Sequence, residues 1–366
     1  MAEAKRITFA QSPLHWLREN LFSSWGNGAL TVLGLYVAWN ILTPALDWAI
    51  FRAVWQGEGR DACTAPDAGA CWPYIGHRMG QIIYGFYDLL ERWRVDIVFA
   101  LGVFGIGWLM LPGLPTKRWV GALMLTLYPV VAYLLLSGGV AGLPIVPTAR
   151  WGGLLLTLVI AVTGIVISLP LGVLLALGRQ SSMPVVRWAS IAFIEVWRGV
   201  PLITVLFMAA NMWQLFLPAG ASSDKLLRAL AAVAIFSSAY MAETVRGGLQ
   251  AIPRGQYEAA KALGLAYWQV MALIVLPQAL RLVIPGIVNT FIGLFKDTTL
   301  ISVIGFLDLL GIIQSGNQDP LWATPNTPYT GYAFVGLVFW SFCFGMSRYS
   351  QAVERRLGVS VVGDRR

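Results

Sequence analysis

Eight long apolar stretches dominate the sequence, and each is long enough to cross a lipid bilayer as a helix. Such a span needs about 20 mostly apolar residues. Backbone polar groups find no water in hydrocarbon, so runs of this length favour helices over the alternating strands of a membrane barrel. The stretches are 29–50, 95–111, 119–136, 151–177, 188–217, 229–249, 283–304 and 331–349. The predicted fold class is therefore all-α, a polytopic integral membrane protein with about eight transmembrane helices.

Charge placement predicts the orientation of these spans. The chain is 57% hydrophobic and 12% charged, with a net charge of +8. Its basic residues lie at the ends of spans and form no dense run beside exposed aromatic residues, so no nucleic-acid partner is expected. With a cytoplasmic N-terminus, 16 of the 26 basic residues fall inside, as the positive-inside rule requires. Both termini are therefore expected in the cytoplasm, and residues 1–25 show no signal peptide to be removed.

The cysteines give one structural prediction. Cys63 and Cys71 lie in the segment 51–94, which this topology places outside, where thiols oxidise. A disulfide between them is predicted, the alternative being two small residues in a loop. Cys343, within the last span, is expected to be a packing residue, and no metal site is predicted.

Glycine and proline mark one boundary along the chain. Residues 137–148, with the sequence SGGVAGLPIVPT, are typical of a connection between two modules. We expect a membrane extension with three helices at 1–149, a second membrane domain at 150–357 and a cytoplasmic tail at 358–366.

The segment 254–278, between two spans, is too polar at its start to cross a membrane. Small residues around Glu258 give way to Gly264, which predicts two short helices joined by a glycine turn. Alanines allow a helix to lie close to another surface, so the segment suits docking into a groove on a partner. The alternative is an ordinary amphipathic surface helix.

This segment resembles the EAA loop of ABC importer permeases. The loop's pattern is matched by Glu258, Ala259 and Ala260, by Gly264, and by the later Ile-x-Leu-Pro that ends at Leu276 and Pro277. Three further segments resemble signatures of the polar amino-acid subfamily, namely EVWRGVPL at 195–202, AYMAETVRGG at 239–248 and KDTTL at 296–300. Several motifs in the right order are far more specific than one. The N-terminal three-span module is similar to that of the longer permease of general L-amino-acid importers.

The resemblance implies an architecture and a set of partners. It implies a type I ABC importer permease core of five helices, with the three-helix extension before it. It also implies that the protein lies in the inner membrane and works with a separate cytoplasmic ATPase. The other implied partners are a second permease subunit, expected to be a related heteromeric chain, a periplasmic binding protein and an amino-acid substrate. The coupling loop to the ATPase would comprise Arg254, Gly255, Glu258, Ala259, Ala260, Gly264, Leu276 and Pro277.

Polar residues inside the spans are candidates for the gate or the translocation path. Glu195 and Arg198 lie three residues apart, as do Glu243 and Arg246, so each pair can share a helix face and neutralise itself. Such pairs serve either function or helix packing. Pro201 predicts a kink near Arg198. The remaining candidates are Asn211 and Asn289, for which interhelical hydrogen bonding is the alternative, and Lys296 and Asp297, an outer gate or a salt bridge.

Two other classes of function fit the sequence less well. The chain has no G-x-x-x-x-G-K-[ST] phosphate loop, so no ATPase activity and no cofactor are expected of it. An ion-coupled secondary transporter would need intramembrane acids or unwound helix pairs at a midplane ion site. Glu195 is the only candidate, and it is expected to be paired. A membrane enzyme would need clustered His, Cys or carboxylate residues, and the two histidines are isolated.

Overall fold

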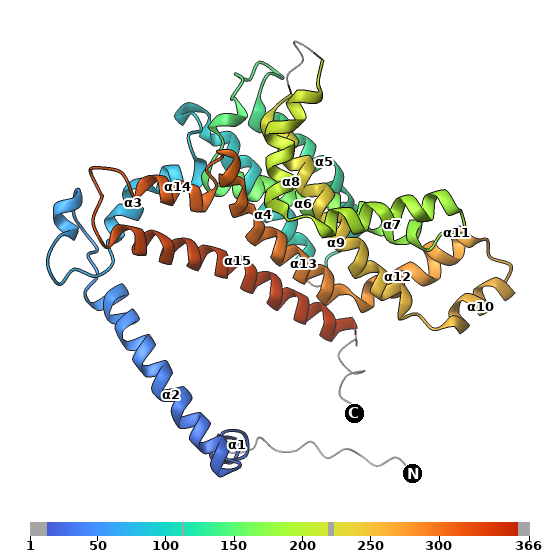
Figure 1. The fold of residues 1–366 in the computed structure, drawn as a ribbon, viewed down its shortest axis with the longest axis horizontal. Coiled ribbons are helices and arrows are strands. Elements are labelled where there is room, and N and C mark those ends of the chain that lie inside the picture. The colour runs from blue at the N-terminus through green and yellow to red at the C-terminus, as the bar shows by residue number, and fades with distance from the viewer. Residues whose placement is uncertain (1–12, 112, 219–222, 358–366) are drawn as a thin grey trace. The chain divides into compact units, whose positions relative to one another are not determined.

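The computed structural model describes residues 13–111, 113–218 and 223–357 (Figure 1). The regular elements of these ranges are helices, together with three isolated β-bridges. The prediction of an all-α membrane protein is confirmed. The predicted tail at 358–366 lies outside the described residues.

The helices reproduce the eight predicted spans. Seven helical stretches in the described part of the chain are long and apolar enough to cross a membrane, and a bent helix pair makes an eighth. The α-helices are α1 (Pro13–Asn20), α2 (Trp25–Leu46), α3 (Trp72–Tyr84), α4 (Arg92–Met110), α5 (Lys117–Ser137), α6 (Gly153–Arg179), α7 (Pro184–Gly199), α8 (Leu202–Phe207), α9 (Lys225–Gln250), α10 (Arg254–Ala262), α11 (Tyr267–Gln269), α12 (Leu276–Leu282), α13 (Ile284–Asp297), α14 (Leu309–Gly316) and α15 (Thr327–Leu357). Shorter 3₁₀ and π segments extend several of them, including η5 (Met208–Met212), η6 (Trp213–Phe216), η7 (Val270–Val275) and η8 (Thr298–Ile304).

The fifth span is the bent pair. α7 and the helix from Leu202 to Phe216 meet at an angle of 101°. Pro201 stands at the break with extended backbone, and its missing N–H removes a helical hydrogen bond there. The predicted kink is confirmed, and it is sharp enough to separate two helices.

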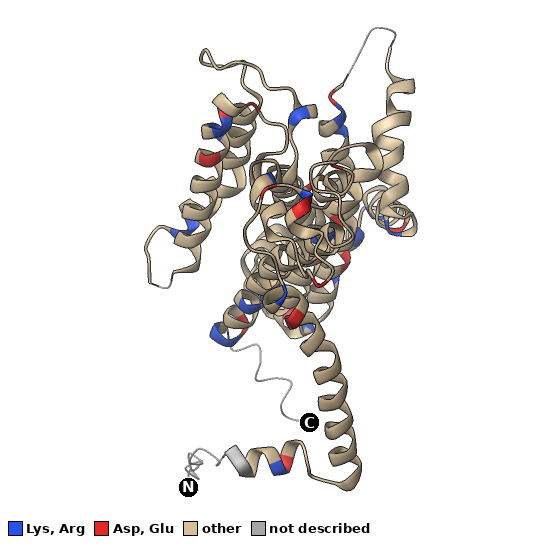
Figure 2. Ribbon diagram, turned by 90° about the vertical axis from the view of Figure 1, so that its left-hand side faces the viewer, with Lys and Arg blue, Asp and Glu red and all other residues tan. Residues whose placement is uncertain are grey.

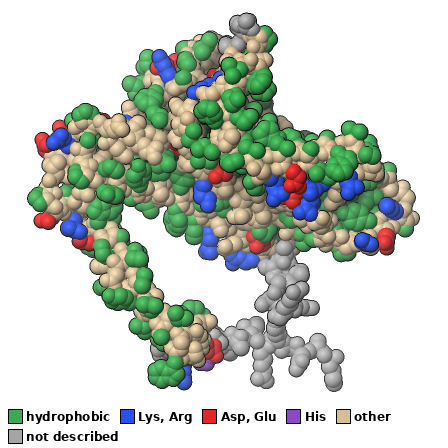
Figure 3. All heavy atoms as spheres, viewed as in Figure 1, with side chains coloured by type: hydrophobic (Ala, Val, Ile, Leu, Met, Phe, Trp, Pro, Cys, Tyr) green, Lys and Arg blue, Asp and Glu red, His purple; other side chains and the backbone are tan. Residues whose placement is uncertain are grey.

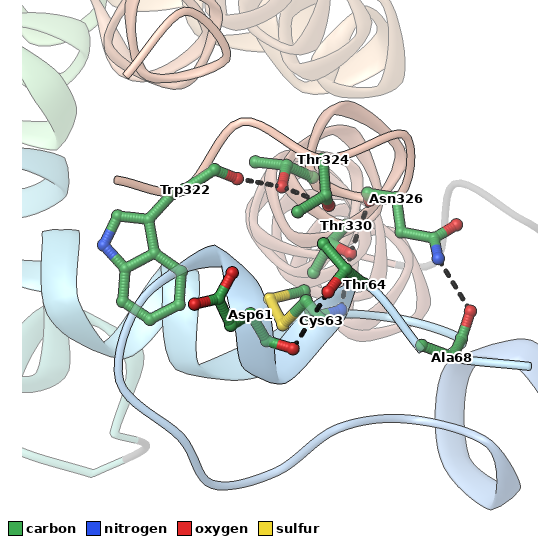
Figure 4. Close-up of a disulfide and its surroundings, with 10 residues drawn as sticks. Asp61, Cys63, Thr64, Ala68, Trp322, Thr324, Asn326 and Thr330 are labelled. Atoms are coloured by element: carbon green, nitrogen blue, oxygen red, sulfur yellow. Dashed lines mark hydrogen bonds between the residues drawn. A yellow bond between two sulfur atoms is a disulfide. The ribbon is translucent and has the colours of Figure 1, made fainter. Parts of the chain in front are cut away.

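The chain forms two compact units. The first holds the described residues up to Gly76 together with Pro320–Thr330, and the second holds the rest. In the first unit the Cys63–Cys71 disulfide closes a loop, as predicted (Figure 4). The backbone N–H of Cys71 donates to Thr330 Oγ1 at 2.9 Å, and Asn326 Nδ2 donates to Ala68 O at 2.7 Å. The loop is thereby fixed to the segment that opens α15.

In the second unit the core is centred on α6 and α9. Gly164 and Gly172 of α6 lie where a Cβ atom would come within 2.8 Å of Leu294 and 2.6 Å of Met241. A Cβ atom at either position would force its neighbour to shift, so glycine favours this close packing. The core continues with buried leucine, valine and isoleucine side chains from α6, α8 and α9.

Apolar side chains also cover much of the surface. Leu30, Leu35 and Trp39 of α2 are more than 60% exposed, as are Phe104 of α4 and Trp119 of α5. Figure 3 shows such side chains over much of the visible face, and Figure 2 shows charged residues to be sparse along the long helices. A surface of this kind is stable in lipid and not in water.

Three backbone segments of the second unit meet at the start of α6. Gly153 N donates to Leu307 O at 2.9 Å, and Phe86 N donates to Arg150 O at 3.0 Å. Asp308, fully buried there, caps α14 by accepting from Gly311 N at 2.9 Å. Its second oxygen has no hydrogen-bond partner among the described residues. Burial raises the pKa of Asp308 to about 6.

Asp308 makes stability depend on pH. Because its folded-state pKa lies above the ordinary value of 3.8, stability is greatest below about pH 4 and falls by about 3 kcal/mol as the pH rises through 6. We expect Asp308→Asn, which keeps an acceptor for Gly311, to raise the thermal unfolding temperature at pH 7.5 but not at pH 4.5. The control is Asp67→Asn, at an exposed position. Equal shifts at both pH values would contradict the prediction.

Candidate functional site

A network of charged side chains joins α6, α7 and α9. Glu243 of α9 accepts from Arg246 at 2.7 and 2.9 Å and from Arg179 of α6 at 2.9 Å. Arg198 of α7 lies 3.7 Å from the same carboxylate, and Arg179 also pairs with Glu195 at 3.0 Å. The side chain of Glu243 is 16% exposed. Glu243 is therefore the carboxylate that three guanidinium groups share, two of them through hydrogen bonds.

The network corrects one prediction. Glu243 and Arg246 pair within one helix, as their spacing predicts. Glu195 and Arg198 do not pair with each other in the structure, because α7 packs beside α6 and α9 and each of the two residues meets a charge from those helices instead. Arg179 was not among the predicted site residues. Its position as a basic residue at the end of a span was the only signal for it.

A cavity of about 610 Å³ lies beside this network. Four predicted residues line it, namely Arg198, Pro201, Asn289 and Asp297. The bend at Pro201 forms one wall, and α9 and α13 supply the others through Tyr240, Thr290 and neighbouring residues. The Arg198 guanidinium lies over the Tyr240 ring, 5.7 Å from its centroid. The cavity thus presents a cationic group and a carboxylate on an otherwise mainly apolar wall.

Asn211 and Lys296, two further predicted residues, do not line this cavity. Asn211 is on η5, where its Nδ2 donates to Phe207 O at 3.3 Å in a local bond. Lys296 is exposed at the end of α13, and no ion pair joins it to Asp297 within the described residues. Between α9 and α13, Thr244 and Thr290 lie 3.4 Å apart at their hydroxyl oxygens. Of the predicted polar residues, Arg198, Asn289 and Asp297 therefore share the cavity, and Asn211 and Lys296 do not.

The segment after α9 forms a separate, exposed site. α10 spans Arg254–Ala262, and Gly264 follows with a φ of 75°, the left-handed conformation that glycine adopts without strain. α10 is labelled at the right of Figure 1. Its residues Arg254, Gly255, Glu258 and Ala259 are exposed, whereas Ala260 is buried. The predicted pair of short helices about a glycine turn is present.

α10 is held to the bundle by one face. Ala260 joins a core cluster with Val270 and Met271 of η7 and with Val245 of α9. Leu276 and the ring of Tyr257 pack against the same cluster. Gln278 Nε2 donates to Gln256 Oε1 at 3.1 Å, which ties α12 to α10, and Pro277 stands in the first turn of α12. The rest of α10 is free to meet another surface.

Comparison with known proteins identifies the family. The family model described as "Binding-protein-dependent transport system inner membrane component" matches residues 168–359, more than half of the chain. The chain belongs to this family. It is a multi-pass inner-membrane permease, as the motifs predicted.

Two relatives of this permease match it over nearly their whole length. It is 51% identical to the inner membrane amino-acid ABC transporter permease protein YhdY of Escherichia coli (strain K12), over 93% of this chain and 92% of that one. It is 42% identical to the glutamate/glutamine/aspartate/asparagine transport system permease protein BztC of Rhodobacter capsulatus, over 94% and 93%. The glutamate/aspartate import permease protein GltK of Escherichia coli O6:H1 is 35% identical, over 55% of this permease and 90% of its own chain. Most of residues 1–149 therefore have counterparts in YhdY and BztC.

The Glu243 network predicts how unevenly its members contribute to stability. Glu243→Gln leaves three guanidinium groups without their common carboxylate, so we expect the free energy of unfolding to fall by about 3 kcal/mol. Glu195→Gln is the matched control, because the Glu195 side chain is 56% exposed and forms a single ion pair. The expected loss of free energy of unfolding for this variant is below about 1 kcal/mol. Both are measured by unfolding of the purified permease in detergent. Similar losses for the two variants would show that Glu243 is not the centre of the network.

Proposed function

We propose that this permease imports amino acids and is driven by a separate ATPase that docks on the coupling helix, α10. The observation that carries the proposal is an exposed helix with the sequence RGQYEAAKA, fixed to the bundle by one face and ended by a left-handed glycine. Glu258 and Ala259 lie on its free face. A small-residue helix of this kind can enter a cleft on a partner closely.

The packing of α10 gives a route for coupling. ATP can drive transport only if the ATPase favours one permease conformation and a contiguous contact transmits that preference. Ala260 and Tyr257 pack on Val270 and Met271, and this cluster continues to Val245 on α9. A displacement of α10 is thereby transmitted to the helix that carries Glu243.

The cavity beside Arg198 supports an amino-acid path. A zwitterionic solute carries a carboxylate, which Arg198 can attract, and an ammonium group, which Asp297 can attract. Asn289 adds an amide to the same wall. We propose that this wall is one half of the path and that a second permease subunit supplies the other.

The remaining assignments follow from the family and the charge pattern. We propose that the second permease is a related but different chain, that a periplasmic binding protein delivers the substrate and that both termini are cytoplasmic. The extension at 1–149 and the permease domain at 150–357 are proposed as separate modules. The names of YhdY and BztC support amino acids as the substrate class.

Reversing the charge of Glu258 tests the coupling helix. We expect Glu258→Arg to reduce ATP-dependent amino-acid uptake at least tenfold in proteoliposomes that hold the permease, its partner subunits and the binding protein. Gly264→Pro should act likewise, because proline cannot adopt a φ of 75°. Glu58→Arg is the control, because it makes the same charge change at an exposed position far from α10 in the sequence. Uptake that persists without ATP and collapses with the proton gradient would instead support a secondary transporter.

A further inference from the structure

An apolar cavity of about 310 Å³ lies between the α4–α5 hairpin and α6. α4 contributes Gly102 and Val103, α5 contributes Tyr128 and Ala132, and α6 contributes Leu158 and Val162. The lining positions recur every three or four residues, so each helix turns one face to the cavity. All three helices are candidate membrane spans of the same compact unit. We name this space the hairpin cavity.

The hairpin cavity is about as long as one leaflet of a membrane is thick. Its wall runs from Trp151, just before α6, to Thr163 in the middle of that helix. Twelve residues of helix rise about 18 Å. One half of the hydrocarbon layer is about 15 Å thick. The cavity therefore matches the length of a lipid acyl chain in the leaflet nearer Trp151.

The size and lining of the cavity suit a hydrocarbon chain. Protein interiors leave few voids larger than a water molecule, so an apolar space of 310 Å³ calls for an occupant. A cavity of about 150 Å³ already holds benzene, so this one has room for a stretch of acyl chain. A helix of a partner is the other occupant that the crosslinking experiment below distinguishes.

Trp151 supplies a polar contact at one end of the cavity. Its side chain lines the cavity and is 2% exposed, and its Nε1 has no hydrogen-bond partner within the described residues. A buried N–H without an acceptor is costly. In a phospholipid the ester carbonyl oxygens stand where the acyl chain begins, at the level where tryptophans gather in membranes. A bound acyl chain would thus bring an ester oxygen that can accept a hydrogen bond from Trp151 Nε1.

We propose that the hairpin cavity binds one acyl chain of a membrane phospholipid, whose ester oxygen accepts a hydrogen bond from Trp151 Nε1. The lipid fills the gap between the hairpin and α6 and so joins the N-terminal extension to the permease domain. These parts also contact each other directly, through the backbone around the start of α6 and through Thr330 and Asn326. The site is independent of the coupling helix.

Photo-crosslinking of the full chain tests this site. Benzoylphenylalanine replaces Val103, which lines the cavity and is 73% exposed, or Leu123, which is exposed on α5 outside it. The protein is purified in detergent, washed extensively and irradiated, and the adduct mass is measured. We expect a phospholipid adduct at 103 and at least tenfold less at 123. An adduct with a peptide, or no lipid adduct at 103, would overturn the proposal.

Substitutions that fill the cavity provide a second test of the lipid site. Ala132→Phe and, independently, Val162→Phe place a ring inside it, and each should reduce the lipid adduct at 103 at least tenfold. Ala122→Phe is the matched control, on the same helix at an exposed position outside the cavity. Variants are compared only when they elute as the wild type does in gel filtration. If both folded filling variants keep the adduct, the lipid lies elsewhere and the proposal fails.

Discussion

α6 and α9 approach each other so closely at Gly172 that a side chain there would collide with Met241 of α9. At Gly172 a Cβ atom would lie 2.6 Å from Met241, and at Gly164 it would lie 2.8 Å from Leu294 of α13. In hydrocarbon, helices gain nothing from leaving water, so association depends on this kind of close packing. α9 also packs on α7, α12 and α13. The positions of these helices, and of the charges that they carry, follow from that contact.

The charges at one end of this bundle link the two sites. Glu243 and Arg246 lie on α9, and Arg246 also donates to Gln250, the last residue of that helix, at 2.8 Å. α10 begins four residues later. On the other side, Arg198 contacts Glu243 and also lines the cavity at Pro201. The network therefore extends from the cavity at Pro201 to the last residue of α9, four residues before the helix on which we propose that the ATPase docks.

The sequence predicted most of the fold and part of the site. Pro201 predicted the break between α7 and α8, and the spacing of Glu243 and Arg246 predicted their ion pair. The disulfide of Cys63 and Cys71 followed from the expected oxidising side of the membrane. The pairing of Glu195 with Arg198 was wrong, although its spacing was identical to that of Glu243 with Arg246. Local spacing does not reveal that Glu195 meets Arg179 of α6 and that Arg198 meets Glu243 of α9.

The sequence by itself determined the spans, the glycine turn at Gly264 and the family. Each of these depends on hydropathy, on backbone conformation or on residues close together in the chain. Only the tertiary structure decided which charges meet at Glu243, which polar residues share a cavity and how Asp308 is buried. These depend on the rotation and separation of packed helices, because a side chain's partner is set by the face it turns to its neighbours.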